Sequence, residues 1–250
     1  GGEALRRRTH QITPNASGVR EYYPGDPHNR IHWVSTARRD RLIVKEFELD
    51  PLAEVWIFLD AARSGHAAML EPKQEFNVLN YWRQTPKVTL PASTEEYSVS
   101  IAASLARHFI RRGRAVGLVS EGRHLTLLPP DRGGRQLGKI LEALAVSRAE
   151  GSLPIRGLIE SQATHLPRGS IVILITPTAH MEFAFVAEYL LRRGLRIIAV
   201  MIDASSFGGP LGNAQLVERL RLLNVPVRRI LNGVDIPSAL SEAVNEKIKA

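Results

Sequence analysis

One short segment of this chain of 250 residues has the residue types and spacing of a cation site. Asp60 ends the apolar run 55–60, and Ser64 follows four residues later. An aspartate with hydroxyl groups two and four residues further on can supply oxygen ligands to Mg²⁺. The middle position is Ala62, which has no hydroxyl, and Arg63 adds a positive charge. Asp60 and Ser64 are therefore the metal candidates, but we expect no bound metal and no cofactor.

Three further oxygen-bearing residues follow other apolar runs. Thr176 and Thr178 come after the run 171–175, and Asp203 comes after 196–202. Unbroken apolar runs of this length are typical of strands that are covered on both faces of a parallel sheet. The carboxyl ends of such strands share one edge, where α/β proteins bind ligands. The residues expected at this rim are Asp60, Ser64, Thr176, Thr178 and Asp203.

Strand and helix patterns alternate from residue 42 to the end of the chain. The predicted strands are 42–49, 55–60, 115–119, 123–128, 171–175, 196–202 and 227–231. The predicted helices are 95–112, 137–145, 155–165, 182–193, 213–223 and a last one from about residue 236. This alternation predicts an α/β fold with a doubly wound, mostly parallel sheet and helices on both faces. The strand at 55–60 should be central, and 123–128 should return in a hairpin.

Two arginine-rich segments, 111–114 and 192–196, lie between a predicted helix and the next strand. Gly113 and Gly194 suit the left-handed position that ends many helices, and cations there complement the helix dipole. A basic face for nucleic acid is the functional alternative. Helix capping explains these residues without a nucleic-acid partner, so we interpret them as structural.

The chain lacks the motifs of common enzyme classes. It has no cysteine, which excludes disulfides, thiolate catalysis and cysteine-ligated metals. It also has no dinucleotide turn, no P-loop and no Gly-x-Ser-x-Gly segment. His28 and His32 have the spacing of a helical metal pair, but they follow a proline turn without a neighbouring glutamate, so we assign them no metal. We therefore expect a protein that is not an enzyme.

The chain is basic, with a net charge of +8 and a pI of about 10.2. Residues 1–45 contain nine Lys/Arg and four Asp/Glu. Such an asymmetry allows nucleic acid, acidic protein or anionic lipid as partner, whereas the alternative is a solvated arm followed by paired arginines. The apolar runs are too short to span a bilayer. The chain starts with Gly-Gly and without methionine, so we expect a piece of a longer protein, which leaves open whether a membrane segment lies upstream.

Residues 19–48 are too polar for a core and too rich in special residues for an arbitrary loop. The turn 24–27, Pro-Gly-Asp-Pro, combines a preset φ, a left-handed position and a side chain that bonds the backbone. Arginines beside carboxylates and aromatic rings can hold an irregular segment in one shape. We call residues 19–48 the signature. Its candidate docking residues are Arg20, Glu21, Tyr22, Gly25, Asp26, Arg30, Trp33, Arg38 and Lys45.

The ordered pattern of Arg-Glu-Tyr, Pro-Gly-Asp, Arg-x-Ile-x-Trp, Ala-Arg and Val-Lys-x-Phe resembles the signature of the domain-of-unknown-function 58 family. The resemblance covers the chain from about residue 18 to its end and implies a von Willebrand factor A-like α/β domain. Related domains carry an Asp-x-Ser-x-Ser metal-ion-dependent adhesion site. This chain departs from that site at Ala62 and at Thr176-Pro177, so the resemblance implies a degenerate site.

The resemblance further implies a membrane-anchored prokaryotic protein that works beside a MoxR-type AAA+ ATPase. On the basis of this resemblance, we interpret the three arginines at residues 6–8 as the cytoplasmic flank of an upstream membrane segment. The expected division is a basic arm at 1–18, a signature extension packed on the domain at 19–50, and the α/β domain at 51–250. The expected location is the cytoplasmic face of the membrane.

Three hypotheses on function follow. The first is a non-enzymatic interaction or adaptor module, in which the segment 20–38 either docks a partner or only braces the fold. The second is nucleic-acid binding through the basic N-terminal face, although few aromatic residues accompany the arginines. The third is a divalent-metal-dependent adhesion domain or enzyme at the Asp60 rim.

Overall fold

The computed structural model describes residues 18–23, 31–46, 53–69 and 90–245. The chain divides into two compact units, and the boundary falls between Pro51 and Leu52. The predicted arm, apart from Gly18, lies outside the described residues.

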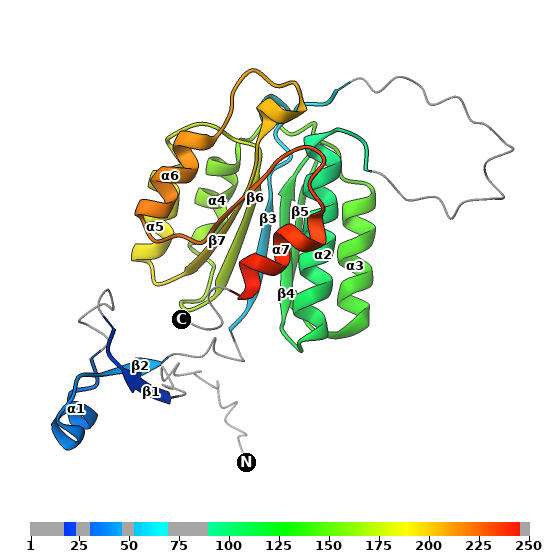
Figure 1. The fold of residues 1–250 in the computed structure, drawn as a ribbon. Coiled ribbons are helices and arrows are strands. Elements are labelled where there is room, and N and C mark those ends of the chain that lie inside the picture. The colour runs from blue at the N-terminus through cyan, green and yellow to red at the C-terminus, as the bar shows by residue number, and fades with distance from the viewer. Residues whose placement is uncertain (1–17, 24–30, 47–52, 70–89, 246–250) are drawn as a thin grey trace, which may run out of the picture. The chain divides into compact units, whose positions relative to one another are not determined.

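The larger unit contains a six-stranded sheet in the order β5-β4-β3-β6-β7-β8 (Figure 1). All neighbouring strands are parallel except β4 and β5, which are antiparallel. The predicted mostly parallel sheet is therefore confirmed, with the first apolar run in its interior. The strands are β3 (Val55–Leu59), β4 (Val116–Glu121), β5 (Leu125–Asp131), β6 (Ile171–Thr176), β7 (Arg196–Ile202) and β8 (Val227–Ile230).

Helices cover both faces of this sheet, as Figure 1 shows. One face is covered by α2 (Thr94–Arg111), α3 (Gly133–Ala145) and α7 (Ile236–Asn245). The other is covered by α4 (Ile155–Ala163), α5 (Phe183–Arg192) and α6 (Ala214–Leu222). Two apolar clusters result, one between each helical layer and the sheet. Every residue of β3 and of β6 is buried, which explains why these strands are apolar on both faces.

Backbone conformation at the helix ends agrees with the caps predicted at Gly113 and Gly194. Gly113 after α2 and Gly194 after α5 have φ values of 72° and 79°, and Asn224 after α6 has a φ of 57°. These left-handed residues end the helices and let the chain turn into the next strand.

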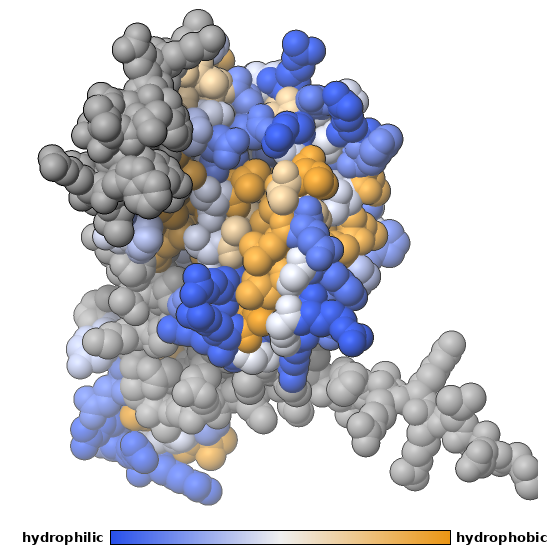
Figure 2. Space-filling model, turned by 90° about the vertical axis from the view of Figure 1, so that its right-hand side faces the viewer, coloured by the Kyte–Doolittle hydropathy of each residue, from blue (hydrophilic) through white to orange (hydrophobic). Residues whose placement is uncertain are grey.

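Some boundaries differ from the prediction. The strand β5 begins at Leu125 rather than at residue 123, and α3 begins one turn earlier than residue 137. The early start of α3 runs through Gly133 and Gly134, which have no apolar side chain and so gave no helical pattern. Leu141 on the outer surface of α3 and Val146 directly after this helix are exposed. Figure 2 shows apolar side chains between hydrophilic ones on this side of the molecule.

The smaller unit contains a two-stranded antiparallel sheet of β1 (Gly18–Glu21) and β2 (Ile43–Glu46). Between them lies the short helix α1 (Trp33–Arg39), where we predicted an irregular or β extension. The helix is short and mixes apolar with polar residues, and none of its seven residues is buried, so the sequence shows no clear apolar face that would have predicted it. No helix among the described residues combines the length and apolarity that a bilayer crossing requires.

Candidate functional site

The parallel register of β3 and β6 places Asp60 beside Thr176 at the carboxyl edge of the sheet. Leu59 pairs with Ile175, so the next residue of each strand is also a neighbour. The Thr176 hydroxyl donates to Asp60 Oδ2 at 2.5 Å, and the Ala62 backbone N–H donates to Asp60 Oδ1 at 3.0 Å. Thr176 Oγ1 in turn accepts from the Thr178 backbone N–H at 3.0 Å. The predicted proximity of these residues is therefore seen, and both carboxylate oxygens of Asp60 have partners from the protein.

Asp60 is almost fully buried, with 4% of its surface exposed. Burial raises the pKa of its carboxyl group above the ordinary value, because the ionised form loses its hydration. The hydrogen bonds from Thr176 and Ala62 and the nearby His66 lower this pKa and offset only part of the rise.

The loop after Asp60 is held by two residues that the sequence did not single out. His66 Nε2 donates to the Asp60 carbonyl at 2.9 Å, and His66 Nδ1 lies 3.0 Å from Thr94 Oγ1 at the start of α2. Thr94 Oγ1 also accepts from the Ala67 backbone N–H at 2.9 Å. No spacing rule relates His66 to Thr94 across 28 positions, so only the folded chain brings them together.

Gly151 holds the same loop from the other side. Its N–H donates to the Ala61 carbonyl and its carbonyl accepts from the Arg63 N–H, both at 2.9 Å. A Cβ at this position would lie 2.1 Å from the Glu121 carbonyl oxygen. Only glycine allows the loop 146–154 to approach β4 and the Asp60 loop this closely.

The donors at this rim do not fit a divalent-cation site. Ser64 is exposed in the 3₁₀ turn Arg63–Gly65, and position 62 contributes a methyl group. In the loop after β6, the residue that follows Thr176 is Pro177, which has no side-chain oxygen. Mg²⁺ requires near-octahedral oxygen ligands, whereas Asp60 already uses both carboxylate oxygens within the protein. Across residues 18–23, 31–46, 53–69 and 90–245, no group of three or more His, Asp or Glu is arranged to hold a metal ion.

Asp203 lies at the same edge but in a separate network. Its Oδ1 accepts from the Ser205 hydroxyl at 2.7 Å and from the Ser205 N–H at 3.1 Å, and its Oδ2 pairs with Arg229. Burial pushes the pKa of Asp203 upward, but the hydrogen bonds from Ser205 and the pairing with Arg229 outweigh it, so this pKa lies below its ordinary value. Asp203 is therefore a structural acid of the β7 and β8 ends.

The structure describes part of the signature. Arg20 and Lys45 lie on β1 and β2, in the antiparallel pairs Arg20–Val44 and Val19–Lys45. The Tyr22 N–H donates to the Leu42 carbonyl at 2.9 Å, which extends this pairing. Glu21 pairs with Arg41, and both side chains are exposed. Gly25, Asp26 and Arg30 lie outside the described residues, as does His28.

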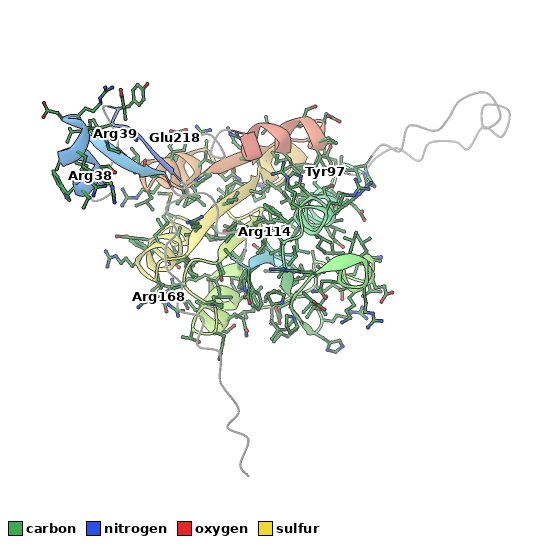
Figure 3. The ribbon with its side chains drawn as sticks, turned by 90° about the horizontal axis from the view of Figure 1, so that it is seen from below. Arg38, Arg39, Tyr97, Arg114, Arg168 and Glu218 are labelled. Carbon is green, nitrogen blue, oxygen red and sulfur yellow. The ribbon has the colours of Figure 1, made fainter. Side chains whose placement is uncertain are left out.

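Helix α1 presents the remaining signature residues. His32 precedes it and accepts from the Ser35 N–H at 3.3 Å through Nδ1, so this histidine caps the helix. Trp33 and Val34 expose 66% and 58% of their surfaces. Arg38 and Arg39 in the last turn are also exposed and are labelled in Figure 3. The structure thus places an apolar pair and a basic pair on one short helix.

Comparisons with known proteins agree with this architecture. Residues 18–79 match the family model "Protein of unknown function DUF58". The uncharacterized protein YeaD of Bacillus subtilis (strain 168) is 25% identical over 220 residues, which are 87% of this chain and 47% of YeaD. The chain thus spans about half the length of this curated relative.

The fold has a counterpart among solved structures. The crystal structure of the conserved hypothetical protein BatB from Bacteroides thetaiotaomicron has a TM-score of 0.50 and 13% identity to this chain. The match covers 79% of this chain and 100% of BatB, a von Willebrand factor A-like protein. The predicted resemblance and fold class are confirmed: this chain carries the DUF58 signature over residues 18–79, and its α/β unit has the von Willebrand factor A-like fold.

Proposed function

We propose that this von Willebrand factor A-like module is a non-enzymatic adaptor, which binds a protein partner through helix α1. The exposure of Trp33 and Val34 beside Arg38 and Arg39 supports this proposal most directly. Tryptophan and arginine are enriched among the residues that dominate protein interfaces. The partner proposed is a MoxR-type AAA+ ATPase, as the family resemblance implies.

The chemistry at the Asp60 rim supports a role without catalysis. Asp60, Thr176, His66 and Thr94 bond to one another or to the backbone, which is what a structural network requires. A general base would need an acceptor directed at a substrate, whereas the Asp60 oxygens are directed at Thr176 and Ala62.

The alternative role of α1 is to brace the signature unit within the chain. The variants Trp33→Ala and Arg38→Glu separate docking from bracing. They are compared in thermal unfolding and in a pull-down with a purified MoxR-type AAA+ ATPase from the same organism. Leu141→Ala is the matched control, since Leu141 is an exposed apolar residue on the outer face of α3.

If α1 docks the partner, both variants should keep the wild-type melting temperature. Their affinity for the ATPase should fall at least tenfold, because interface tryptophans often contribute ~2 kcal/mol or more. The control should bind like the wild type. A large drop in melting temperature would instead assign α1 to bracing. Unchanged binding by both folded variants would contradict docking through α1.

The metal-dependent alternative has its own test. Titration of the chain with Mg²⁺ and Mn²⁺ in a calorimeter should give no binding heat, because the rim offers too few free oxygens. A binding heat that disappears in Asp60→Asn would contradict the non-metal proposal.

A further inference from the structure

The amino-terminal edge of the α/β unit gathers the ends of many elements. Strands β3, β4, β6, β7 and β8 are mutually parallel, so their first residues lie along one edge. Helices α2, α4, α5 and α6 lead back toward that edge and end there, at the bottom of the unit in Figure 1. The opposite edge carries the Asp60 rim.

Charge is distributed unequally between these two edges. The arginines near the amino-terminal edge are Arg107, Arg111, Arg112, Arg114, Arg132, Arg135, Arg168, Arg192, Arg193, Arg196, Arg219, Arg221 and Arg228. The acids described there are fewer: Glu54, Asp131, Glu160, Glu188 and Glu218. At the carboxyl edge, acids outnumber arginines: Asp60, Glu95, Glu96, Glu121, Glu150, Glu182, Asp203 and Asp235 against Arg63, Arg123, Arg148, Arg156 and Arg229. The unit is therefore electrically polarised along its strands.

Some of these arginines form hydrogen bonds or ion pairs within the α/β unit. Arg193 donates to the carbonyls of Ala163 and Thr164 at the end of α4, so it satisfies the last carbonyls of that helix. Arg192 pairs with Glu188, and Arg221 pairs with Glu218. The capping interpretation therefore holds for Arg193, and these pairs are local to their own helices.

Four other arginines have no such role. Arg111, Arg112, Arg168 and Arg219 are exposed, and among the described residues none of them has a carboxylate within ion-pair distance. They come from the end of α2, the segment before β6 and the last turns of α6. Figure 3 looks at the unit from this side, with Arg168 labelled. Their positive charge is thus available to a partner.

Apolar side chains accompany this charge. Leu222, the last residue of α6, exposes 74% of its surface one residue after Arg221. Tyr189, one turn before the end of α5, is also exposed, and Arg193 lies 6.0 Å from its ring centroid. Helices that lie at a membrane interface combine basic residues with leucine, and tyrosine is enriched at such interfaces.

We propose that the amino-terminal edge of the α/β unit binds the surface of a bilayer that contains anionic phospholipids. Guanidinium groups bond phosphate oxygens bidentately, and a bilayer offers phosphates across a plane. The free arginines come from separate elements along the edge, so a planar partner can meet them together. Leu222 can bury its side chain among the lipids, whereas the phosphate backbone of a nucleic acid offers it no apolar environment. This proposal concerns the α/β unit and does not depend on docking through α1.

The test uses the whole chain in co-sedimentation with vesicles of phosphatidylcholine, prepared with and without phosphatidylserine. Binding is expected only with phosphatidylserine and should weaken as salt rises, because the charges are exposed. The double variant Arg111→Ala/Arg112→Ala should lose roughly 25-fold in affinity, since each basic residue near an anionic surface contributes about fivefold. Leu222→Ala should weaken binding without changing its salt dependence.

Arg63→Ala is the matched control, because Arg63 is an exposed arginine at the opposite edge. It should bind like the wild type, and all variants should keep the wild-type melting temperature. Equal binding to vesicles without phosphatidylserine, or an equal loss in Arg63→Ala, would overturn the proposal. Failure to bind vesicles, together with arginine-dependent binding of a DNA duplex, would overturn it in favour of nucleic acid. These results are independent of the ATPase pull-down, so the two proposals can fail separately.

Discussion

Asp60 and Asp203 lie at the same edge of the sheet, but their surroundings shift their pKa values in opposite directions. Asp60 is buried with two neutral donors, and burial dominates. Asp203 is buried as well, but it faces Arg229 and the donors of Ser205, which outweigh burial. The first carboxylate therefore costs stability when it ionises, whereas the second contributes stability.

Asp60→Asn should stabilise the chain relative to the wild type at neutral pH. Below the unfolded pKa of about 3.8, both states of the wild type are protonated at this site. As the pH rises, the unfolded state ionises first, so the wild type loses stability until its raised folded pKa is passed. Urea unfolding at several pH values measures the difference. A difference that does not grow between pH 3 and pH 7 would contradict the raised pKa.

Asp203→Asn should have the opposite effect and destabilise the chain at neutral pH. The ionised Asp203 contributes stability above its unfolded pKa of about 3.8, and this contribution disappears as the pH falls through the lower folded pKa. The difference from the wild type should therefore close in acid.

Arg229→Met, which leaves the buried Asp203 carboxylate without its cation, should cost about 3 kcal/mol. This is the lower end of the range for buried pairs, because the Arg229 side chain is 36% exposed. Urea unfolding at pH 7 measures it. A variant as stable as the wild type would show that Ser205 alone compensates the charge.

At the level of the elements, each helix must end where the next strand begins, and left-handed residues allow this turn. Gly194 ends α5 with a φ of 79°, and Asn224 follows α6 with a φ of 57°. This backbone conformation is strained for residues with a Cβ, and the strain is smaller for asparagine than for most other residues.

Gly194→Ala should therefore destabilise the chain by ~1 kcal/mol, because no atom lies near the new Cβ and only the backbone is strained. Asn224→Gly is the matched reverse change and should destabilise the chain less, because glycine adopts the left-handed conformation without strain. Thermal unfolding of both variants compares them. Equal destabilisation by the two changes would mean that the φ values do not decide the outcome.

At the scale of the whole molecule, the two units differ in how they are stabilised. Both apolar clusters consist of residues between Val55 and Leu240, and neither contains a residue of the smaller unit. The smaller unit has only one two-stranded sheet and one short helix among its described residues. Two-stranded sheets are marginal by themselves in water.

A fragment of residues 52–247 should therefore fold without the signature. We expect a single cooperative unfolding transition that coincides in circular dichroism and tryptophan fluorescence, because the fragment retains both clusters. The whole chain is the control. A fragment without a cooperative transition would show that the signature unit is required for the α/β fold.

The sequence predicted the α/β unit well because its signals are strong. The runs at β3 and β6 are apolar throughout, which only a covered strand explains. The caps at Gly113 and Gly194 were equally predictable from residue type. Helix α1 was not predicted, since Trp33 and Val34 form no apolar stripe of helical period.

The sequence by itself determined the fold class, the family signature and the nearness of Asp60 to Thr176, because local periodicity and parallel strand order carry that information. Only the tertiary structure decided how the Asp60 oxygens are used, and it alone brought His66 to Thr94 and Gly151 to Ala61. It also placed arginines from separate segments along one edge and acids along the other. These contacts join residues that are far apart in the chain, and no spacing rule relates such residues before the chain folds.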